Sequence, residues 1–410
     1  MASLGRVLIV VENLPVPFDR RVWMEATTLA GAGYDVAVIS PKGRGFARGH
    51  ETIDGVAVYR HDLAVEGHSA LTYLREYAAA LLAESALARR IYRERPFDII
   101  HICNPPDLMF LFAAWFRLRH GVRVVFDHHD INPELYEVKY GRRDLFYWLL
   151  RLAERCTFLT ASVVITTGES YRAIALSRGA KRPENVFIVR SGPDLSKFRP
   201  VEPVAAYRRG RRHLVGYVGV MGPQEGIDYL LRAVEIIVKE MGRTDISFML
   251  IGAGPSATDL RALARELGVD PYVEFPGRVP DNELIARLST CDVCVNPDPY
   301  NAFNDASVMN KILEYMALKR AVVQFDLTEG RRSAGPAAAY AHPNDAHDMA
   351  ETIVALLDDD RRRSQMAEEG YRRMRDELEW RHQIPKLLQA YARVGRATSR
   401  RGPRGALPKP

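Results

Sequence analysis

Histidines and carboxylates gather at one point of the chain, directly after an apolar run. Residues 122–126 form a segment rich in β-branched and aromatic side chains, which predicts a buried strand. Directly after it come Asp127, His128, His129 and Asp130. Imidazole changes its protonation near neutral pH, and a carboxylate beside it can orient it. Adjacent side chains of an extended chain point in opposite directions, so two histidines would need a local turn to hold one metal ion. We therefore take His129, His128 and Asp130 as candidate catalytic residues; a metal site at this point would require such a turn.

A glycine-rich turn occupies residues 219–226, between a predicted strand and a predicted helix. Its backbone N–H groups and the helix start favour a phosphate, with Gly219, Met221 and Gly222 as candidate contacts. The same glycines are also typical of a tight β-to-α turn without a ligand. Residues 251–255 lack the third glycine of a dinucleotide fingerprint and run into a proline. We therefore expect no dinucleotide cofactor.

A second polar group opens a predicted helix at residues 308–318. Ser307 is expected to cap this helix, with Val308 as its first residue. Lys311 and Glu314 lie three residues apart, so they share one face, and by themselves they would form a surface salt bridge. Because the group follows a strand and a long loop, a ligand-facing position competes with that interpretation.

Short β-branched runs alternate with amphipathic stretches along nearly the whole chain. This alternation predicts an α/β fold of two Rossmann-like, doubly wound parallel-sheet domains. The expected strands are residues 7–11, 35–40, 56–60, 97–103, 122–126, 161–166, 186–189, 214–218, 247–251, 273–275, 293–296 and 321–325. The expected helices are residues 22–32, 71–95, 108–120, 145–158, 170–178, 227–241, 257–267, 282–289, 308–318 and 346–357.

The domain boundaries follow from composition. Residues 200–212 are rich in proline and arginine and read as a linker, which separates a domain at 1–197 from one at 213–371. Helices at about 372–395 are expected to pack back on the first domain, with Pro385 marking a kink or a boundary. The basic residues 396–410 are expected to form a disordered tail. Since parallel sheets bind ligands beyond the carboxyl ends of their strands, the expected site is the cleft between the domains.

Charge is distributed unevenly along the 410 residues. The net charge is +6 overall, but +8 over residues 1–212 and −7 over residues 213–395. The basic first half would suit an anionic membrane surface or a phosphate-bearing acceptor. Arginines recur at helical spacing within 71–95 and 142–155, which permits a peripheral membrane contact, although such helices usually just pack on the sheet. No nucleic-acid-binding motif accompanies them.

The sequence shows neither a membrane-spanning run nor a signal-peptide core, and this predicts a cytoplasmic protein. No apolar run reaches the roughly 20 residues that a bilayer requires, and residues 7–11 are too short for a signal-peptide core. We therefore expect a cytoplasmic protein, peripheral at the inner membrane face if it meets a membrane. The pair Cys291 and Cys294 has the spacing of half a zinc site, but no second pair completes it.

Several segments together resemble glycosyltransferase family 4, the retaining transferases with the GT-B fold. The most specific is Asn310-Lys311-Ile312-Leu313-Glu314-Tyr315-Met316-Ala317. Further likeness lies in residues 217–231, 248–255 with 273–279, 292–297, 21–38, 97–101, 129–130 and 191–194 with Phe198. The resemblance covers nearly the whole chain.

The resemblance implies transfer of a sugar from a nucleotide-sugar donor, with retention at the anomeric carbon and without a metal. A UDP-sugar is the favoured donor, with dTDP- and GDP-sugars as alternatives, and the acceptor is unknown. By the same resemblance Glu314 would bind the ribose hydroxyls and His129 the donor sugar, with His128 in reserve. The diphosphate would meet backbone N–H groups at Gly222 and near Ser307 and Val308, with Lys311 as a cation.

The chain departs from the family pattern at three positions. The first acid of the paired motif falls on Ala306, with Asp305 beside it as a substitute. Val220 and Glu225 stand where the family has arginine and lysine in the phosphate loop. An anion at that position would repel a phosphate.

Other arginines could compensate. Arg331 and Arg332 are candidates on the donor side, whereas Arg20, Arg21 and Asn104 are placed on the acceptor side. The loop that carries Arg20 and Arg21 lacks the family's usual glycine pair. The prediction is therefore a glycosyltransferase; the alternatives are a GT-B nucleotide-sugar 2-epimerase and a non-catalytic nucleotide-sugar-binding subunit.

Overall fold

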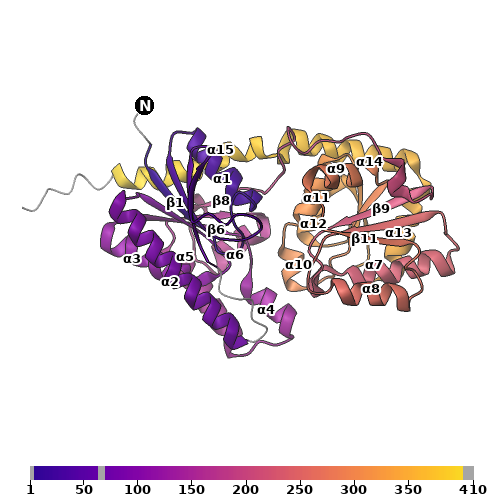
Figure 1. Cartoon of the computed structure of the whole chain (residues 1–410), viewed down its shortest axis with the longest axis horizontal. Helices are drawn as coiled ribbons and strands as arrows, with labels where there is room; N and C mark the ends of the chain where they lie inside the picture. The colour runs from indigo at the N-terminus through magenta and orange to yellow at the C-terminus, as the bar shows by residue number, and fades with distance from the viewer. Residues whose placement is uncertain (1–3, 63–69, 400–410) are drawn as a thin grey trace, which may run out of the picture. The chain divides into compact units, whose positions relative to one another are not determined.

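The computed structural model describes residues 4–62 and 70–399, with the backbone alone for residues 70–77 and 396–399. The chain divides into two compact units (Figure 1). The first holds the chain up to Glu137, Arg142–Arg190 and the part from Ile384 onward. The second holds Val138–Gly141 and Ser191–Gln383.

The first unit is built on an eight-stranded sheet in the order β3-β4-β2-β1-β5-β6-β7-β8, in which only β3 is antiparallel to its neighbour. Its strands are β1 (Arg6–Val10), β2 (Asp35–Pro41), β3 (His50–Ile53), β4 (Val56–His61), β5 (Ile99–Cys103), β6 (Arg123–His128), β7 (Val163–Thr166) and β8 (Val186–Ile188). Every residue of β5 and β7 is buried. A parallel sheet covered on both faces requires such runs of apolar residues.

Helices connect these strands. They are α1 (Arg20–Gly31), α2 (Ala70–Glu94), α3 (Phe110–His120), α4 (Asn132–Tyr140), α5 (Leu145–Thr160) and α6 (Glu169–Ser177). One core joins Ala88 and Ile91 of α2, Phe112 and Phe116 of α3 and Phe158 of α5 to apolar side chains of the sheet.

The second unit has a six-stranded, fully parallel sheet in the order β11-β10-β9-β12-β13-β14. Its strands are β9 (His213–Val218), β10 (Ile246–Ile251), β11 (Val273–Gly277), β12 (Val293–Asn296), β13 (Ala321–Phe325) and β14 (Ala338–Ala341). Its helices are α7 (Ile227–Glu235), α8 (Ala257–Glu266), α9 (Asp281–Thr290), α10 (Ala302–Ala306), α11 (Asn310–Ala317), α12 (Thr328–Ala334), α13 (Ala346–Asp358) and α14 (Asp360–Arg373).

The C-terminal segment differs from its prediction. Residues 372–383 belong to the second unit, because Met374 and Leu378 are buried in its core with Ile312 and Met316 of α11. Helix α15 runs from Trp380 to Ser399 with Pro385 inside it, so the interruption lies at the extended Glu379 and not at the proline. Residues 400–410, most of the predicted disordered tail, lie outside the described residues.

Among the described residues, no helix combines the length and apolar character that a membrane span needs.

Candidate functional site

Each sheet has a switch point, a strand from which the following strands are added first on one side and then on the other. In the first sheet β1 lies between β2 and β5, and in the second β9 lies between β10 and β12. Ligands of open parallel sheets bind at the carboxyl ends of the strands at such a switch point. The predicted residues Arg21, Asn104 and His129 follow β1, β5 and β6, and Gly219–Gly222 follow β9. The topology therefore brings the predicted groups of each unit to the ligand-binding edge of its sheet.

Arg21 forms a buried ion pair with Asp127, the next to last residue of β6. Its Nε lies 2.9 Å from Asp127 Oδ2 and its Nη2 lies 2.7 Å from Oδ1, a bidentate arrangement. Arg21 Nη1 also donates to the backbone oxygen of Val189 at 2.8 Å. Burial would raise the pKa of Asp127, but Arg21, His129 and His101 outweigh it and hold that pKa well below its usual range. Arg21 is thus a structural cation inside the first unit, and its predicted place on the acceptor side is not supported by its burial.

His129 is joined to the same pair. Its Nε2 lies 2.5 Å from Asp127 Oδ2 and 3.0 Å from Arg21 Nε, and 17% of its side chain is exposed. Asn104 fixes the backbone at this point, because its Oδ1 accepts from His129 N at 2.7 Å and from Asp130 N at 3.2 Å. Asn104 is 3% exposed and orients the turn that carries His129. This burial does not support the predicted position of Asn104 on the acceptor side.

The inner side of this network is closed by three further buried groups. His101 Nδ1 lies 2.8 Å from the hydroxyl of Tyr391 on α15, and its Nε2 lies 3.7 Å from Glu25 Oε2. Glu25 is 0% exposed, and burial together with the charge of Asp127 raises its pKa well above the ordinary value. We name Arg21, Glu25, His101, Asp127 and His129 the Arg21 cluster.

One set of residues in this region has a geometry compatible with a metal. Ligand atoms of His101, Cys103 and Asp127 lie within 4.8 Å of one another. However, Asp127 already accepts bonds from Arg21 at both oxygens and contacts His129 as well. A guanidinium therefore holds the charge that a metal ion would otherwise supply to this carboxylate.

His128 points away from the Arg21 cluster. Its side chain is 0% exposed and packs among the rings of Phe126, Phe158 and Tyr171 at centroid distances of 5.0–5.3 Å. Burial lowers the pKa of His128 to about 3, so the imidazole is neutral. The structure thus removes the reserve candidate, because successive residues at the end of β6 face opposite sides of the sheet.

Asp107 is linked to the His129 turn through Asn104. Its burial leads us to expect that the stability of the protein depends on pH. Asp107 is 3% exposed, its Oδ1 accepts from Asn104 Nδ2 at 3.2 Å, and burial raises its pKa from 3.8 to about 7. The folded chain therefore holds this proton between about pH 4 and pH 7, where the unfolded chain has lost it, and stability falls as the pH rises through that window. The loss is on the order of 4 kcal/mol. Urea unfolding from pH 4 to 8 should show this slope, and Asp107→Asn should reduce it; equal slopes in both proteins would contradict the assignment.

In the second unit, the glycine-rich loop packs closely on its neighbour. Gly219 N donates to Ile251 O and Met221 N donates to Ala253 O, both at 3.1 Å. These two N–H groups are thus engaged within the protein, contrary to their predicted role toward phosphate. Gly226, at φ +64°, precedes α7, and an added Cβ would lie 2.0 Å from Pro297 O, so this turn requires glycine. Of the predicted loop contacts, Gly222 remains.

Lys311 lies at the centre of a buried ion triad. Its Nζ is 2.8 Å from Glu225 Oε2 and 2.9 Å from Asp298 Oδ1, and the residue is 8% exposed. Burial would lower the pKa of Lys311, but Asp298 and Glu225 raise it well above the ordinary value. A surface salt bridge with Glu314, one of the two interpretations of this pair, is therefore not the main interaction of Lys311. Glu225, which stands where the family has a cation, offsets the charge of Lys311.

The start of α11 also differs from its prediction. The helix begins at Asn310 and no side chain caps it. Ser307 instead ends α10 and donates from Oγ to Phe303 O at 2.7 Å, and Val308 lies in the connection. Asp305 Oδ1 accepts from Thr328 N at 2.7 Å, so it holds the first turn of α12. Glu314 lies half-buried on α11, three residues after Lys311.

The predicted compensating arginines of the second unit have local partners. Arg331 contacts both oxygens of Asp326, with Nε 2.7 Å from Oδ1, and lies 3.9 Å from the ring of Tyr340. Arg332 donates to Glu329 at 2.7 Å. Arg20 is exposed at the start of α1. Neither Arg331 nor Arg332 is thus an uncommitted cation for a diphosphate.

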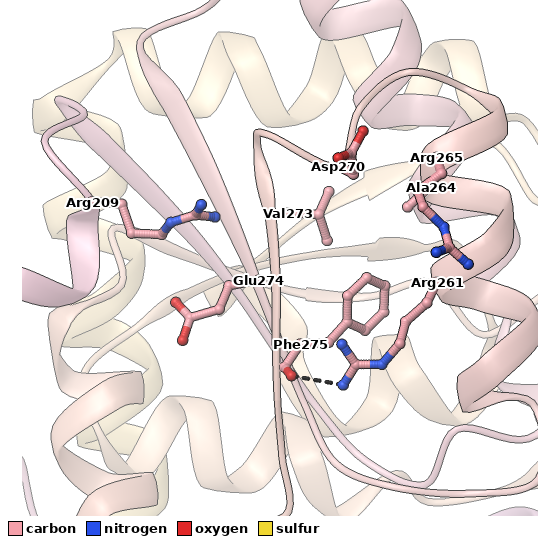
Figure 2. Close-up of a pocket in the computed structure, with 8 residues that line it drawn as sticks. All are labelled: Arg209, Arg261, Ala264, Arg265, Asp270, Val273, Glu274 and Phe275. Atoms are coloured by element: carbon pink, nitrogen blue, oxygen red, sulfur yellow. Dashed lines mark hydrogen bonds between the residues drawn. The ribbon is translucent and has the colours of Figure 1, made fainter.

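A cavity of about 510 Å³ lies elsewhere in the second unit. Figure 2 shows its lining from β11, α8 and the segment before β9, including Arg209, Arg261 and Glu274. Arg261 is held by a 2.8 Å bond to Phe275 O. None of the predicted site residues lines this cavity, and its position at β11 separates it from the glycine-rich loop in sequence and sheet order.

Sequence reasoning missed the partners that give this site its electrostatics. His101 is a polar residue in the otherwise apolar strand β5, and such a residue is itself a signal. Glu25, Asp298 and Tyr391 stand in α1, in the loop after β12 and in α15, where a polar side chain is not unusual. Which partner satisfies each one depends on contacts across 13 to 290 residues. Those pairings become visible only in the fold.

Two protein-family models match the chain. The model described as "Glycosyl transferase 4-like domain" matches residues 19–192, and that described as "Glycosyl transferases group 1" matches residues 212–359. D-inositol 3-phosphate glycosyltransferase from Corynebacterium efficiens is 28% identical over 230 residues, which is 51% of this chain and 51% of that protein. The aligned region thus spans about half of this relative.

Solved structures share the architecture over nearly the full length. Sucrose-phosphate synthase from Thermosynechococcus elongatus has a TM-score of 0.80 at 18% identity and covers 96% of this chain and 100% of its own. HepE from Anabaena, in complex with UDP and glucose, has a TM-score of 0.70 at 14% identity, covering 97% and 100%. Two parallel-sheet units with polar groups at their switch points define a protein of the GT-B fold. The two domain matches identify it further: the chain belongs to glycosyltransferase family 4.

Proposed function

We propose that this protein transfers a sugar from a nucleotide-sugar donor to a hydroxyl-bearing acceptor. The observation that carries the proposal is the correspondence between the two domain matches and the two sheet edges, each with polar groups at its switch point. The relative from Corynebacterium efficiens is named a glycosyltransferase, which favours transfer over epimerisation or binding alone.

The second unit is proposed to hold the nucleotide. Glu314 on α11 would accept from the ribose hydroxyls, as the family motif implies. Because Glu225 and Asp298 offset the charge of Lys311, the leaving diphosphate would be stabilised chiefly by backbone N–H groups at Gly222 and in the first turn of α11. A UDP-sugar is the favoured donor, since HepE of the same fold was solved with UDP and glucose.

The first unit is proposed to present His129 to the donor sugar. The imidazole is the part of the Arg21 cluster with substantial exposure, at 17%. Arg21 and Asp127 would fix the orientation of the imidazole toward the donor sugar. The acceptor is left open among glycans, lipid-linked sugars and small molecules.

Thermal unfolding with nucleotides tests the proposal. A ligand that binds only the folded protein raises its stability by an amount set by concentration and affinity. UDP, GDP, ADP and dTDP, with their sugar conjugates, are titrated in parallel, and one nucleotide should raise the melting temperature at micromolar to millimolar concentration. Release of that nucleoside diphosphate should require an acceptor. Turnover without acceptor to an altered sugar would support the epimerase, and no shift with any nucleotide would contradict donor binding.

Glu314→Ala is expected to weaken nucleotide binding about tenfold or more, because a carboxylate that accepts hydrogen bonds from a ligand contributes roughly 1.5–3 kcal/mol. The fold should be unaffected, since Glu314 is only half-buried. Calorimetric titration with the nucleotide found above measures the change. Glu351→Ala on α13, with a side chain 59% exposed, is the matched control. Equal affinities in wild type and Glu314→Ala would remove this residue from the nucleotide site.

A further inference from the structure

The solvent side of helix α5 is apolar, the reverse of an ordinary surface helix. Leu145, Trp148, Leu149 and Leu152 are 75%, 58%, 50% and 57% exposed, and Leu159 continues the row at 60%. Their spacing of three, four and seven residues places them on one face. The opposite face is buried and carries Tyr147, Glu154, Thr157 and Phe158. The helix therefore buries its only carboxylate and exposes four of its five leucines.

Helix α3 extends this apolar face. Leu111, Trp115 and Leu118, also spaced by four and three residues, are 51%, 45% and 85% exposed. The two helices pack against each other on one side of the first sheet (Figure 1). Arg117 joins their C-terminal ends, with Nη1 3.2 Å from Leu159 O. We name the exposed apolar residues of both helices the α3–α5 surface. Contiguous apolar exposure of this kind marks an interaction site.

The exposed charged residues within α3 and α5 themselves are all basic, and Asp144, which caps α5, pairs with Arg142. Helix α3 contains no acid, and the single acid of α5, Glu154, is 1% exposed. Arg119 and Arg155 are exposed on the same two helices. A second copy seated on this surface would bring like charges together, whereas an anionic bilayer would attract them. Exposed tryptophans beside leucines and arginines are the composition of a helix lying in a membrane interface.

We propose that α3 and α5 form a membrane-docking surface, which seats the first unit on an anionic lipid bilayer with Trp115, Trp148 and the exposed leucines inserted among the lipid headgroups. The proposal concerns the first unit alone and stands independently of the proposed nucleotide site. It also makes the expected membrane contact of residues 142–155 more specific. The apolar residues of α5 would insert into the bilayer interface, and the arginines would attract the anionic lipids.

Sedimentation of the full chain with lipid vesicles tests this. Wild type should sediment with vesicles of phosphatidylcholine and phosphatidylglycerol, and much less with phosphatidylcholine alone, and its tryptophan emission should shift to shorter wavelength. The variant Leu149→Glu with Leu152→Glu should bind at least about tenfold more weakly, because two inserted side chains become charged. Val201→Glu, an exposed apolar residue (42%) of the second unit, should behave as wild type.

Each contrary result is distinguishable. No sedimentation of wild type with either vesicle overturns the proposal. Equal binding by the double variant would assign the attraction to another basic segment, such as residues 396–410, and would also overturn it. A wild-type mass of twice the chain by light scattering, halved in the double variant, would show that a second copy covers the α3–α5 surface. An unchanged melting temperature and nucleotide shift in the double variant would show that the fold and the proposed donor site are intact.

Discussion

Arg21→Met is expected to lower the free energy of unfolding by about 3–5 kcal/mol, the usual cost of removing one partner from a buried ion pair. The guanidinium contacts both oxygens of Asp127 and lies 3.2 Å from Glu25, with both carboxylates 0% exposed. Without it, Asp127 would retain its charge in an apolar interior or take up a proton. Methionine preserves most of the side-chain volume, so the change reports on charge and hydrogen bonds rather than on a cavity.

Urea denaturation of wild type and Arg21→Met measures this change, with the transition of the first unit followed separately if the two units unfold in steps. Arg20→Met is the matched control, since the neighbouring arginine is exposed at the helix start and should cost less than about 0.5 kcal/mol. Arg21→Lys keeps the charge but cannot contact both oxygens in the same plane, and an intermediate loss is expected. If Arg21→Met were as stable as Arg20→Met, the Arg21–Asp127 pair would not be a stabilising element.

His129→Ala is expected to reduce kcat by about 100-fold or more while changing nucleotide affinity little. The imidazole lies 2.5 Å from Asp127 and 3.0 Å from Arg21, and it is the exposed end of the Arg21 cluster. A group that acts on the transition state and not on the bound nucleotide lowers kcat and leaves binding unchanged. Steady-state kinetics of nucleoside diphosphate release, with calorimetry for the nucleotide, separates these two effects.

The adjacent histidine provides the sharpest comparison. His128→Phe preserves the contact with Phe126, Phe158 and Tyr171 and removes a neutral, fully buried imidazole. Turnover of this variant should stay within about threefold of wild type, as expected when one buried ring replaces another. If His128→Phe lost as much turnover as His129→Ala, the assignment of the catalytic role to His129 alone would be wrong. Full activity of His129→Ala would remove His129 from the reaction.

The sequence predicted most of the strands because their physical origin is local. The run at residues 7–11 is apolar throughout, and the run at 247–251 is apolar after Ser247; both form interior strands, β1 and β10. The elements that were missed carry weak local signals. Helix α12, with the sequence Thr-Glu-Gly-Arg-Arg-Ser-Ala, has no apolar periodicity, and β14 is a run of Ala-Ala-Tyr-Ala. Both are held by their neighbours: Asp305 caps α12, and β14 pairs with β13.

The candidate site was predictable in position but not in electrostatics. The order of strands and loops placed Arg21, His129 and the glycine-rich loop at the edges where ligands bind. The charge state of each group depends on distant partners, as Lys311 shows. Its neighbour in sequence, Glu314, suggested a salt bridge, yet its Nζ lies 2.8 Å from Glu225, 86 residues away. Burial decides such pairings, because a cation excluded from water must find carboxylates wherever the fold supplies them.

The contact between the Tyr391 hydroxyl and His101 has a consequence for how the chain folds during its synthesis. Chains generally fold from the N-terminus while they emerge from the ribosome. The first unit cannot complete its folding before the second unit is synthesised. Part of its core comes from the end of the chain, where three residues are 0% exposed: Leu387, Ala390 and Tyr391. Until then His101 lacks its partner and the inner side of the Arg21 cluster stays open. The core of the first unit is therefore complete only after helix α15, the last helix of the chain, has been synthesised and has packed against it.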